Sequence, residues 1–106
     1  MSTATPVLAV TPGEPAGIGP EILLKLCRER PELRILAVAD PQLLQQAAVS
    51  LGYRQTIHRW SPGMEIRPGE LACHPVSLGE PAVPGRLNSA NAHYVLETLT
   101  EAVRLV

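Results

Sequence analysis

The residues that could carry chemistry are concentrated in one stretch, TPGEPAGIGPE, which runs from Thr11 to Glu21. It contains three glycines: Gly13, Gly17 and Gly19. Without a Cβ, such residues allow a sharp turn and a close approach of another group. Pro20 and Glu21 suit the first turn of a helix, so the stretch is predicted to end as a helix begins. A glycine turn that presents backbone N–H groups there can receive an anion or a dinucleotide.

The spacing of these glycines, G-x-x-x-G-x-G, matches neither common nucleotide fingerprint. It differs from G-x-G-x-x-G, and no Gly-Lys-Ser/Thr follows as in a P-loop. On spacing alone, a plain connector is the more frequent interpretation and a nucleotide site is the alternative. If the loop binds a dinucleotide, its backbone N–H groups and its glycines would lie against that cofactor. The candidate cofactor-binding residues are Gly13, Glu14, Gly17, Ile18 and Gly19.

The polar side chains suggest few further roles. Glu14 would repel a phosphate and could accept hydrogen bonds from hydroxyl groups, but we favour exposure to solvent or a hydrogen bond that braces the loop. Arg86 could reach a phosphate, although an isolated arginine is more often solvated. No Ser/His/Asp set and no pair of carboxylates can be assembled, so the sequence offers no candidate catalytic residue.

The histidines and cysteines do not form a metal-binding pattern. The histidines, none of which pairs with a carboxylate or another histidine at metal-ligand spacing, are His58, His74 and His93. We interpret each as a surface or packing residue, although His93, beside Asn91, could line a cleft. Cys27 and Cys73 are far apart in sequence and are interpreted as small buried hydrophobes.

Length and composition indicate one soluble domain. The chain has 106 residues, of which 45% are apolar and 18% charged, and its net charge is −1. This charge gives no reason to expect nucleic acid or an anionic membrane as a partner. The first residues lack the basic region and long apolar run of a signal peptide. We therefore predict a cytoplasmic protein.

The elements around the glycine stretch predict an α/β fold. Val7 to Val10 is a short apolar run, typical of a strand covered on both faces of a parallel sheet. After the stretch, one face of a helix is predicted from Ile22, Leu23, Leu26 and Cys27. A second strand, from Arg34 to Val38, completes a right-handed βαβ unit with parallel strands.

Asp40 and Pro41 are predicted to begin a second helix, which Gly52 ends. Its buried face is predicted from Leu43, Leu44, Ala47, Ala48 and Leu51. Asp40 also follows the glycines at about the distance of the ribose-binding acid of a Rossmann fold, which is the alternative to a helix cap. We favour the cap, because it accounts for the residue fully.

The second half of the chain gives weaker patterns. Thr56 to Trp60 could be a short strand before a turn at residues 61–63, and Leu71 to Val76 another strand, which Pro75 would place at a sheet edge. Leu78 to Arg86 is predicted as an irregular loop. A last helix, capped by Asn88 or Ser89, is predicted to bury Ala92, Val95, Leu96, Leu99, Ala102, Val103 and Val106. Its apolar pattern continues to the end of the chain, which suggests that this face belongs to a larger core.

PGEPAGIGPE resembles the opening motif of the 4-hydroxythreonine-4-phosphate dehydrogenases, the PdxA family. It resembles more distantly the PGDGIGPE loop of isopropylmalate and isocitrate dehydrogenases. ILAVAD, in the second strand, and NSANAHYVLETLTEA, in the last helix, are also similar to segments in the N-terminal part of that family.

The resemblance implies a partial isocitrate/isopropylmalate-dehydrogenase-like α/β/α fold with a mostly parallel sheet. It implies a homodimer with active sites near the subunit interface. Members of the family use NAD and a divalent metal (Zn, Mg or Co) to oxidise 4-phosphooxy-threonine, a small phosphorylated substrate. Decarboxylation then gives 3-amino-2-oxopropyl phosphate, a precursor of pyridoxal 5′-phosphate.

The family's metal-binding histidines and its substrate contacts belong to segments after the point where this sequence stops. None is carried over, and His58, His74 and His93 do not replace them. Residues 1–106 are therefore expected to be the N-terminal portion of such a dehydrogenase, incomplete at the C-terminal end and inactive alone. The alternatives are a paralogue that acts on another phosphorylated hydroxy acid, or a stand-alone nucleotide-binding or oligomerisation module.

Overall fold

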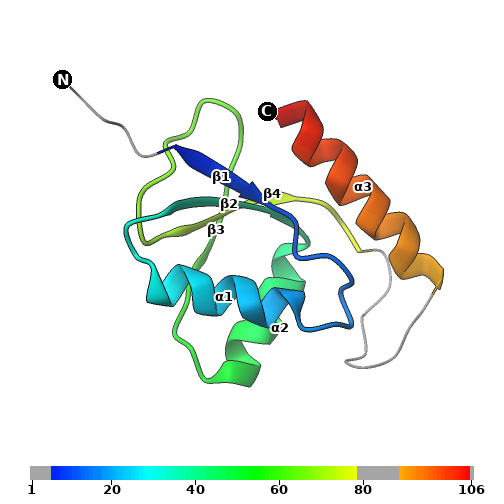
Figure 1. The fold of residues 1–106 in the computed structure, drawn as a ribbon, viewed down its shortest axis with the longest axis horizontal. Coiled ribbons are helices and arrows are strands. Elements are labelled where there is room, and N and C mark those ends of the chain that lie inside the picture. The colour runs from blue at the N-terminus through cyan, green and yellow to red at the C-terminus, as the bar shows by residue number, and fades with distance from the viewer. Residues whose placement is uncertain (1–5, 79–88, 106) are drawn as a thin grey trace.

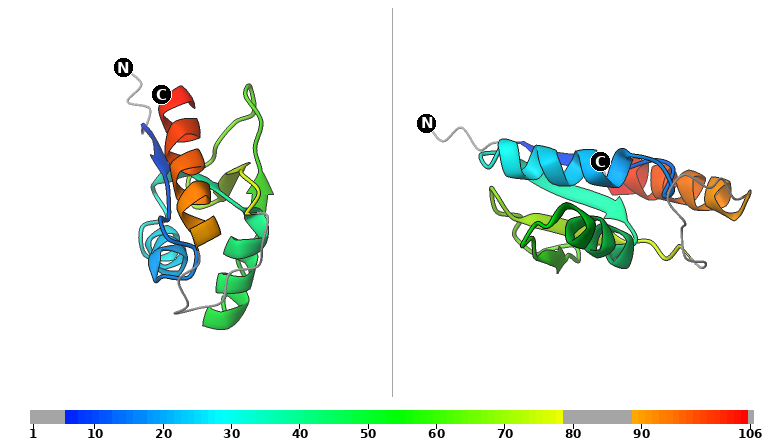
Figure 2. Two further views of the ribbon diagram at one scale, coloured as in Figure 1. Left: turned by 90° about the vertical axis from the view of Figure 1, so that its right-hand side faces the viewer. Right: turned by 90° about the horizontal axis from the view of Figure 1, so that it is seen from below.

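The computed structural model describes residues 6–78 and 89–105, which form a parallel sheet between helices (Figure 1). The sheet has four strands in the order β1-β2-β4-β3, and all of its pairs are parallel. Helices α1 and α2 cover one face and α3 covers the other, which confirms the predicted α/β class (Figures 1 and 2). The elements in chain order are β1 (Val7–Val10), α1 (Gly19–Glu29), β2 (Arg34–Ala39), α2 (Pro41–Leu51), β3 (Ile57–Arg59), β4 (Leu71–Pro75) and α3 (Ser89–Leu105).

The core is built on β2, whose side chains alternate between the two faces of the sheet. Ile35 and Ala37 pack against α1 and α2, and Leu36 and Val38 lie on the face of α3. All four are buried, which explains the unbroken apolar run of this strand.

The prediction that β1 is covered on both faces is wrong. Among the described residues β1 pairs only with β2, so it is an edge strand, and Val7 and Leu8 are 44% and 42% exposed. A short apolar run has the same pattern at an edge as in the centre of a sheet, because the pattern does not record the neighbouring strand.

Helix α1 is rotated slightly from its predicted orientation. Leu23 and Cys27 are buried as expected, but Leu24 is fully buried and Ile22 is 54% exposed. The buried face is centred one residue later because α1 packs against both the sheet and α2.

Helix α2 has the predicted boundaries. The Asp40 side chain accepts a hydrogen bond from the backbone N–H of Gln42, and Pro41 is the first helical residue. Gly52 ends the helix with a φ of +71°, a left-handed conformation that glycine adopts without a steric penalty. Asp40 is therefore a helix cap, the role that we favoured over a ribose contact.

The structure confirms β3, the turn at residues 61–63 and β4, but β4 is not at an edge. Pro75 is tolerated there because of where its missing N–H would point. The neighbouring N–H of Val76 donates to Ala39 on β2, so the Pro75 nitrogen faces the β3 side. Pairing with β3 ends at Arg59 and Cys73, and no ladder hydrogen bond is lost.

The last helix exists, but it buries a different face. Asn91, Tyr94 and Thr98 are almost fully buried against the sheet, whereas the predicted core residues Leu96, Leu99 and Val103 are 64%, 46% and 77% exposed. Tyr94 belongs to the apolar cluster between α3 and the sheet, and its hydroxyl oxygen accepts a hydrogen bond from the backbone N–H of Asp40, so a polar residue can occupy the core.

The predictions for most of the loop to Arg86, for the Asn88 cap and for Val106 lie outside the described residues. No helix in the described ranges is long and apolar enough to cross a membrane.

Candidate functional site

The glycine loop joins β1 to α1 at the carboxyl ends of the parallel strands. Residues 11–18 form this loop, and β2 and β4 end at the same edge of the sheet, at Ala39 and Pro75. In open parallel α/β sheets, ligands bind in crevices at this edge. The loop therefore lies where such a fold places a binding site.

Each of the three positions requires glycine for a different steric reason. Gly13 has a φ of +78°, which other residues rarely adopt. A Cβ on Gly17 would lie 3.3 Å from the carbonyl oxygen of Glu14, which accepts the Gly17 N–H at 3.0 Å. A Cβ on Gly19 would overlap the carbonyl oxygen of Pro12 and lie 2.8 Å from its carbonyl carbon. The tight turn is thus possible only with glycine at its end.

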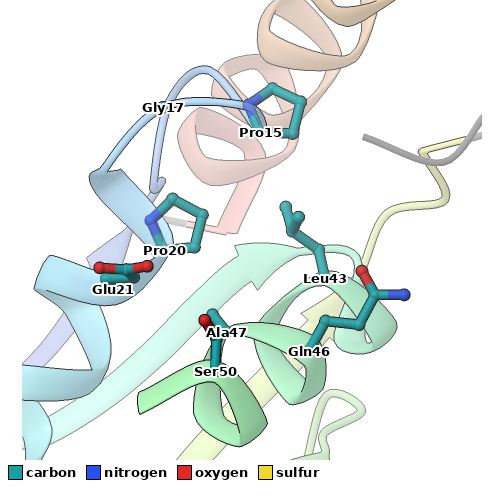
Figure 3. Close-up of a pocket in the computed structure, with 8 residues that line it drawn as sticks. All are labelled: Pro15, Gly17, Pro20, Glu21, Leu43, Gln46, Ala47 and Ser50. Carbon is teal, nitrogen blue, oxygen red and sulfur yellow. The ribbon is translucent and has the colours of Figure 1, made fainter. Parts of the chain in front are cut away.

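A cleft of about 100 Å³ lies between this loop and α2 (Figure 3). Its walls are mainly apolar, with the rings of Pro15 and Pro20 facing the side chain of Leu43. The lining residues are Pro15, Gly17, Pro20, Glu21, Leu43, Gln46, Ala47 and Ser50. Pockets for whole ligands usually measure roughly 300–1,000 Å³, so this cleft has room for only part of a dinucleotide.

Of the five predicted cofactor residues, only Gly17 lines this cleft. Ile18 precedes α1 and its side chain is 72% exposed, while Gly19 packs against Pro12. Gly13 shapes the turn through its backbone conformation. The loop residues are close together, but most of them define the shape of the loop and do not face the cleft.

Glu14 braces the loop, as we favoured from the sequence. Its Oε1 accepts a hydrogen bond from Nδ2 of Asn91 at 2.6 Å and one from the backbone N–H of Ala16 at 3.3 Å. Asn91 is only 2% exposed, so α3 holds the loop through a buried amide. Sequence reasoning missed this role of Asn91, because the two partners are 77 residues apart.

A second polar network joins Asp40 to α3 and to the segment after β4. The backbone N–H of Asp40 donates to the Tyr94 hydroxyl oxygen at 2.7 Å, and Asp40 Oδ2 accepts from the Leu78 N–H at 2.8 Å. Burial raises the pKa of Tyr94 to about 12. Both carboxylate oxygens of Asp40 are already engaged by backbone donors, which agrees with a structural role.

The two cysteines are buried and free. Cys73 donates from Sγ to the carbonyl oxygen of Ala39 at 3.3 Å, and burial raises its pKa to about 11. Burial also raises the pKa of Cys27. Both therefore remain thiols at neutral pH and act as small core residues, as predicted.

The three histidines are not brought together. His58 and His93 are exposed, and His74 lies beneath α3, where its Nε2 is 3.1 Å from Oε2 of Glu101. Its ring packs edge-on against Trp60. No local pattern of residues indicates this pair, since it depends on how α3 crosses the sheet. Among residues 6–78 and 89–105, no three His, Cys, Asp or Glu side chains could hold a metal ion.

The similar curated proteins described next carry the same enzyme name. The chain is 43% identical over 106 residues to the 4-hydroxythreonine-4-phosphate dehydrogenase of Marinobacter nauticus, covering 98% of this chain and 31% of the relative. It is 45% identical over 98 residues to the enzyme of the same name from Chromobacterium violaceum, covering 92% and 30%. The chain thus spans about a third of the length of these curated relatives. No protein-family model matches it.

Solved structures show the same fold. A 4-hydroxythreonine-4-phosphate dehydrogenase from Burkholderia phymatum superposes with a TM-score of 0.82 at 23% identity, covering 97% of this chain and 33% of the other. One from Klebsiella pneumoniae gives 0.81 at 20% identity, covering 99% and 34%. The resemblance seen in the sequence motif is therefore confirmed over nearly the whole chain.

Proposed function

We propose that the chain is the N-terminal part of an NAD-dependent 4-hydroxythreonine-4-phosphate dehydrogenase. Nearly the whole chain aligns with such enzymes, and the aligned segment is about a third of the length of each. The complete protein would oxidise the secondary hydroxyl group of 4-phosphooxy-L-threonine. Decarboxylation would follow, on the route to pyridoxal 5′-phosphate. We further propose that the complete enzyme is a cytoplasmic homodimer. The single observation that carries the proposal is the 43% identity to the Marinobacter nauticus enzyme.

In this proposal the chain supplies one wall of the cofactor crevice. Gly17 lines the cleft, and the prolines on either side of it, Pro15 and Pro20, restrict the conformations of the loop. Glu21, Gln46 and Ser50 offer hydrogen-bonding groups, and the Glu21 carboxylate disfavours a phosphate there. The cleft would therefore take an uncharged part of NAD, such as a ribose, while the rest of the cofactor extends beyond it.

The described residues do not provide the reactive wall. NAD would supply the hydride acceptor, but the described part of the chain contains no group of three side chains that could hold a metal ion. The residues present do not fit the family's divalent metal, so no step through a metal is derived. We propose that the 106-residue chain is inactive alone.

A chimera tests this function directly. Residues 1–106 replace the aligned segment of the Marinobacter nauticus enzyme, and formation of NADH is measured with 4-phosphooxy-L-threonine. We expect activity from the chimera and none from the 106-residue chain. A folded chimera that does not reduce NAD would contradict the proposal, and turnover by the chain alone would contradict its inactivity.

Calorimetry separates the proposal from a stand-alone module. If the 106-residue chain binds NAD with micromolar affinity, as a monodisperse folded protein, it acts as a module by itself. We expect much weaker binding, because the cleft encloses only a small part of the cofactor.

A further inference from the structure

The first two turns of α3 carry two polar side chains that are almost fully buried. Asn91 and Tyr94 are 2% and 1% exposed, and a spacing of three residues places them next to each other on one face of the helix. A buried polar group costs free energy unless it is hydrogen-bonded, whereas an apolar side chain would fill the same space without that cost. Both residues have their hydrogen-bond partners outside α3, at the two walls of the cleft.

Asn91 contacts the wall that the glycine loop forms. Its Nδ2 donates to Oε1 of Glu14 at 2.6 Å, and the same oxygen accepts the backbone N–H of Ala16 at 3.3 Å. The carbonyl oxygen of Glu14 accepts the N–H of Gly17, and Gly17 lines the cleft together with Pro15. A single amide on α3 is therefore linked through Glu14 to the part of the loop that faces the cleft.

Tyr94 contacts the opposite wall, which α2 forms. Its hydroxyl oxygen accepts the backbone N–H of Asp40, the N-cap of α2, at 2.7 Å. Its ring belongs to the same buried cluster as Leu43. The side chain of Leu43 in turn faces the rings of Pro15 and Pro20 across the cleft (Figure 3). No described residue of α3 lines the cleft, yet this helix is joined to both of its walls.

We propose that Asn91 and Tyr94 are positioning residues for NAD, which together fix the separation between the glycine loop and α2. The inference rests on the proposed function, which places part of NAD in this cleft. A loop that spends only a fraction of the time in the competent position binds its ligand with an affinity reduced by that fraction. Loss of either contact should therefore raise the KM for NAD. It should leave kcat nearly unchanged, because saturating NAD selects the competent position.

The contact between Glu14 and Asn91 is tested by reversing its polarity in the chimera. Asn91→Asp sets two carboxylates against each other and should raise the KM for NAD about tenfold, as expected for the loss of a hydrogen bond to a charged group. The value of kcat should stay within about twofold of the parent chimera. Glu14→Gln keeps an acceptor for the Asn91 amide and should change the KM by less than about threefold.

The double variant Glu14→Gln/Asn91→Asp restores the contact with donor and acceptor exchanged. The new amide at position 14 can donate to the new carboxylate at position 91, and its oxygen can still accept the N–H of Ala16. The KM for NAD should therefore return to within about threefold of the parent chimera. A role of Asn91 in filling space alone would not produce this recovery.

Two further variants separate the second contact from a general loosening of α3. Tyr94→Phe removes the acceptor for the Asp40 N–H but keeps the ring, so the KM for NAD should rise about threefold. The matched control is Thr98→Ala, on the same face of α3. Thr98 is 1% exposed and its hydroxyl group donates to the carbonyl oxygen of Val95 within the helix. This control should lower the melting temperature and leave the KM for NAD unchanged.

Three results would overturn the inference. The first is an Asn91→Asp chimera whose KM for NAD equals that of the parent. The second is a double variant whose KM does not recover. The third is a Thr98→Ala chimera whose KM rises as much as that of Asn91→Asp.

Calorimetry with NAD measures the same changes as dissociation constants, without turnover. A chimera that binds NAD in the expected order among the variants but does not oxidise 4-phosphooxy-L-threonine refutes the proposed function and retains the positioning role. An active chimera whose affinity for NAD is not changed by Asn91→Asp retains the function and refutes the role. A chimera that does not bind NAD refutes both.

Discussion

Replacing Gly19 by alanine should strongly destabilise the chain, because of where its Cβ would lie. The new Cβ would overlap the carbonyl oxygen of Pro12 and lie 2.8 Å from the carbonyl carbon. Both atoms belong to the backbone of a buried residue, so no side chain can rotate to make room. The loop would have to move away from the start of α1.

The magnitude follows from two opposing effects. Alanine in a helix is favoured over glycine by up to about 1 kcal/mol. Forcing extra atoms into a packed site typically costs about 1–3 kcal/mol, and overlap with backbone atoms lies at or above the upper end of that range. We therefore expect Gly19→Ala to lower the free energy of unfolding by about 2–3 kcal/mol, which corresponds to a decrease of roughly 10–20 °C in melting temperature for a domain of this size.

Gly17→Ala is the matched control in the same loop. Its Cβ would lie 3.3 Å from the Glu14 carbonyl oxygen, and the residue is exposed, so a small shift relieves the contact. We expect a change below about 1 kcal/mol. Urea and thermal unfolding, followed by circular dichroism, measure both variants. Equal stabilities of the two variants, or a Gly19→Ala protein as stable as the wild type, would refute the close packing that defines the loop.

Three further predictions concern the polar contacts around the site. Asn91→Ala leaves the Glu14 carboxylate without its amide donor and should cost about 1–2 kcal/mol in urea unfolding, with faster hydrogen exchange in residues 13–19. Asp40→Ala removes the cap of α2 and the acceptor for Leu78, and should cost about 1–2 kcal/mol, measured by thermal unfolding against the wild type. Stability should fall at alkaline pH, because burial raises the pKa of Cys73 to about 11 and that of Tyr94 to about 12. The unfolded chain loses these protons first, so each contribution is complete below the ordinary pKa, near 9 for the thiol and near 10 for the phenol, and is lost as the pH rises through the folded value. Urea titrations between pH 8 and 12 should show the decrease begin near pH 9. Cys73→Ala should make the decrease smaller, with Cys27, whose pKa burial also raises, still contributing from near pH 9; a decrease as large as in the wild type would contradict the assignment.

Local sequence signals predicted the parts of the fold that depend on a few neighbouring residues. The boundaries of α2 follow from Asp40, Pro41 and Gly52, each of which acts within one turn of helix. The glycine loop was recognisable because the turn needs glycine at particular positions, whatever the rest of the fold contains. The βαβ arrangement of β1, α1 and β2 follows from chain connectivity.

Features that depend on distant partners were not predictable in this way. The central place of β4 depends on the register between Pro75 and the end of β3. The buried face of α3 is set by Asn91 and Tyr94, whose partners are on the glycine loop and at Asp40. A pattern of apolar residues assigns a polar side chain to the surface, and it cannot register a hydrogen bond formed only after folding.

Hydrogen exchange of the chimera in the presence of NAD tests the central claim, that the glycine loop forms a wall of the cofactor crevice. With saturating NAD, peptides that contain residues 13–19 and the start of α2 should take up deuterium more slowly, and peptides from β3 should not change. A chimera that oxidises 4-phosphooxy-L-threonine while NAD leaves the exchange of residues 13–19 unaltered would contradict the claim.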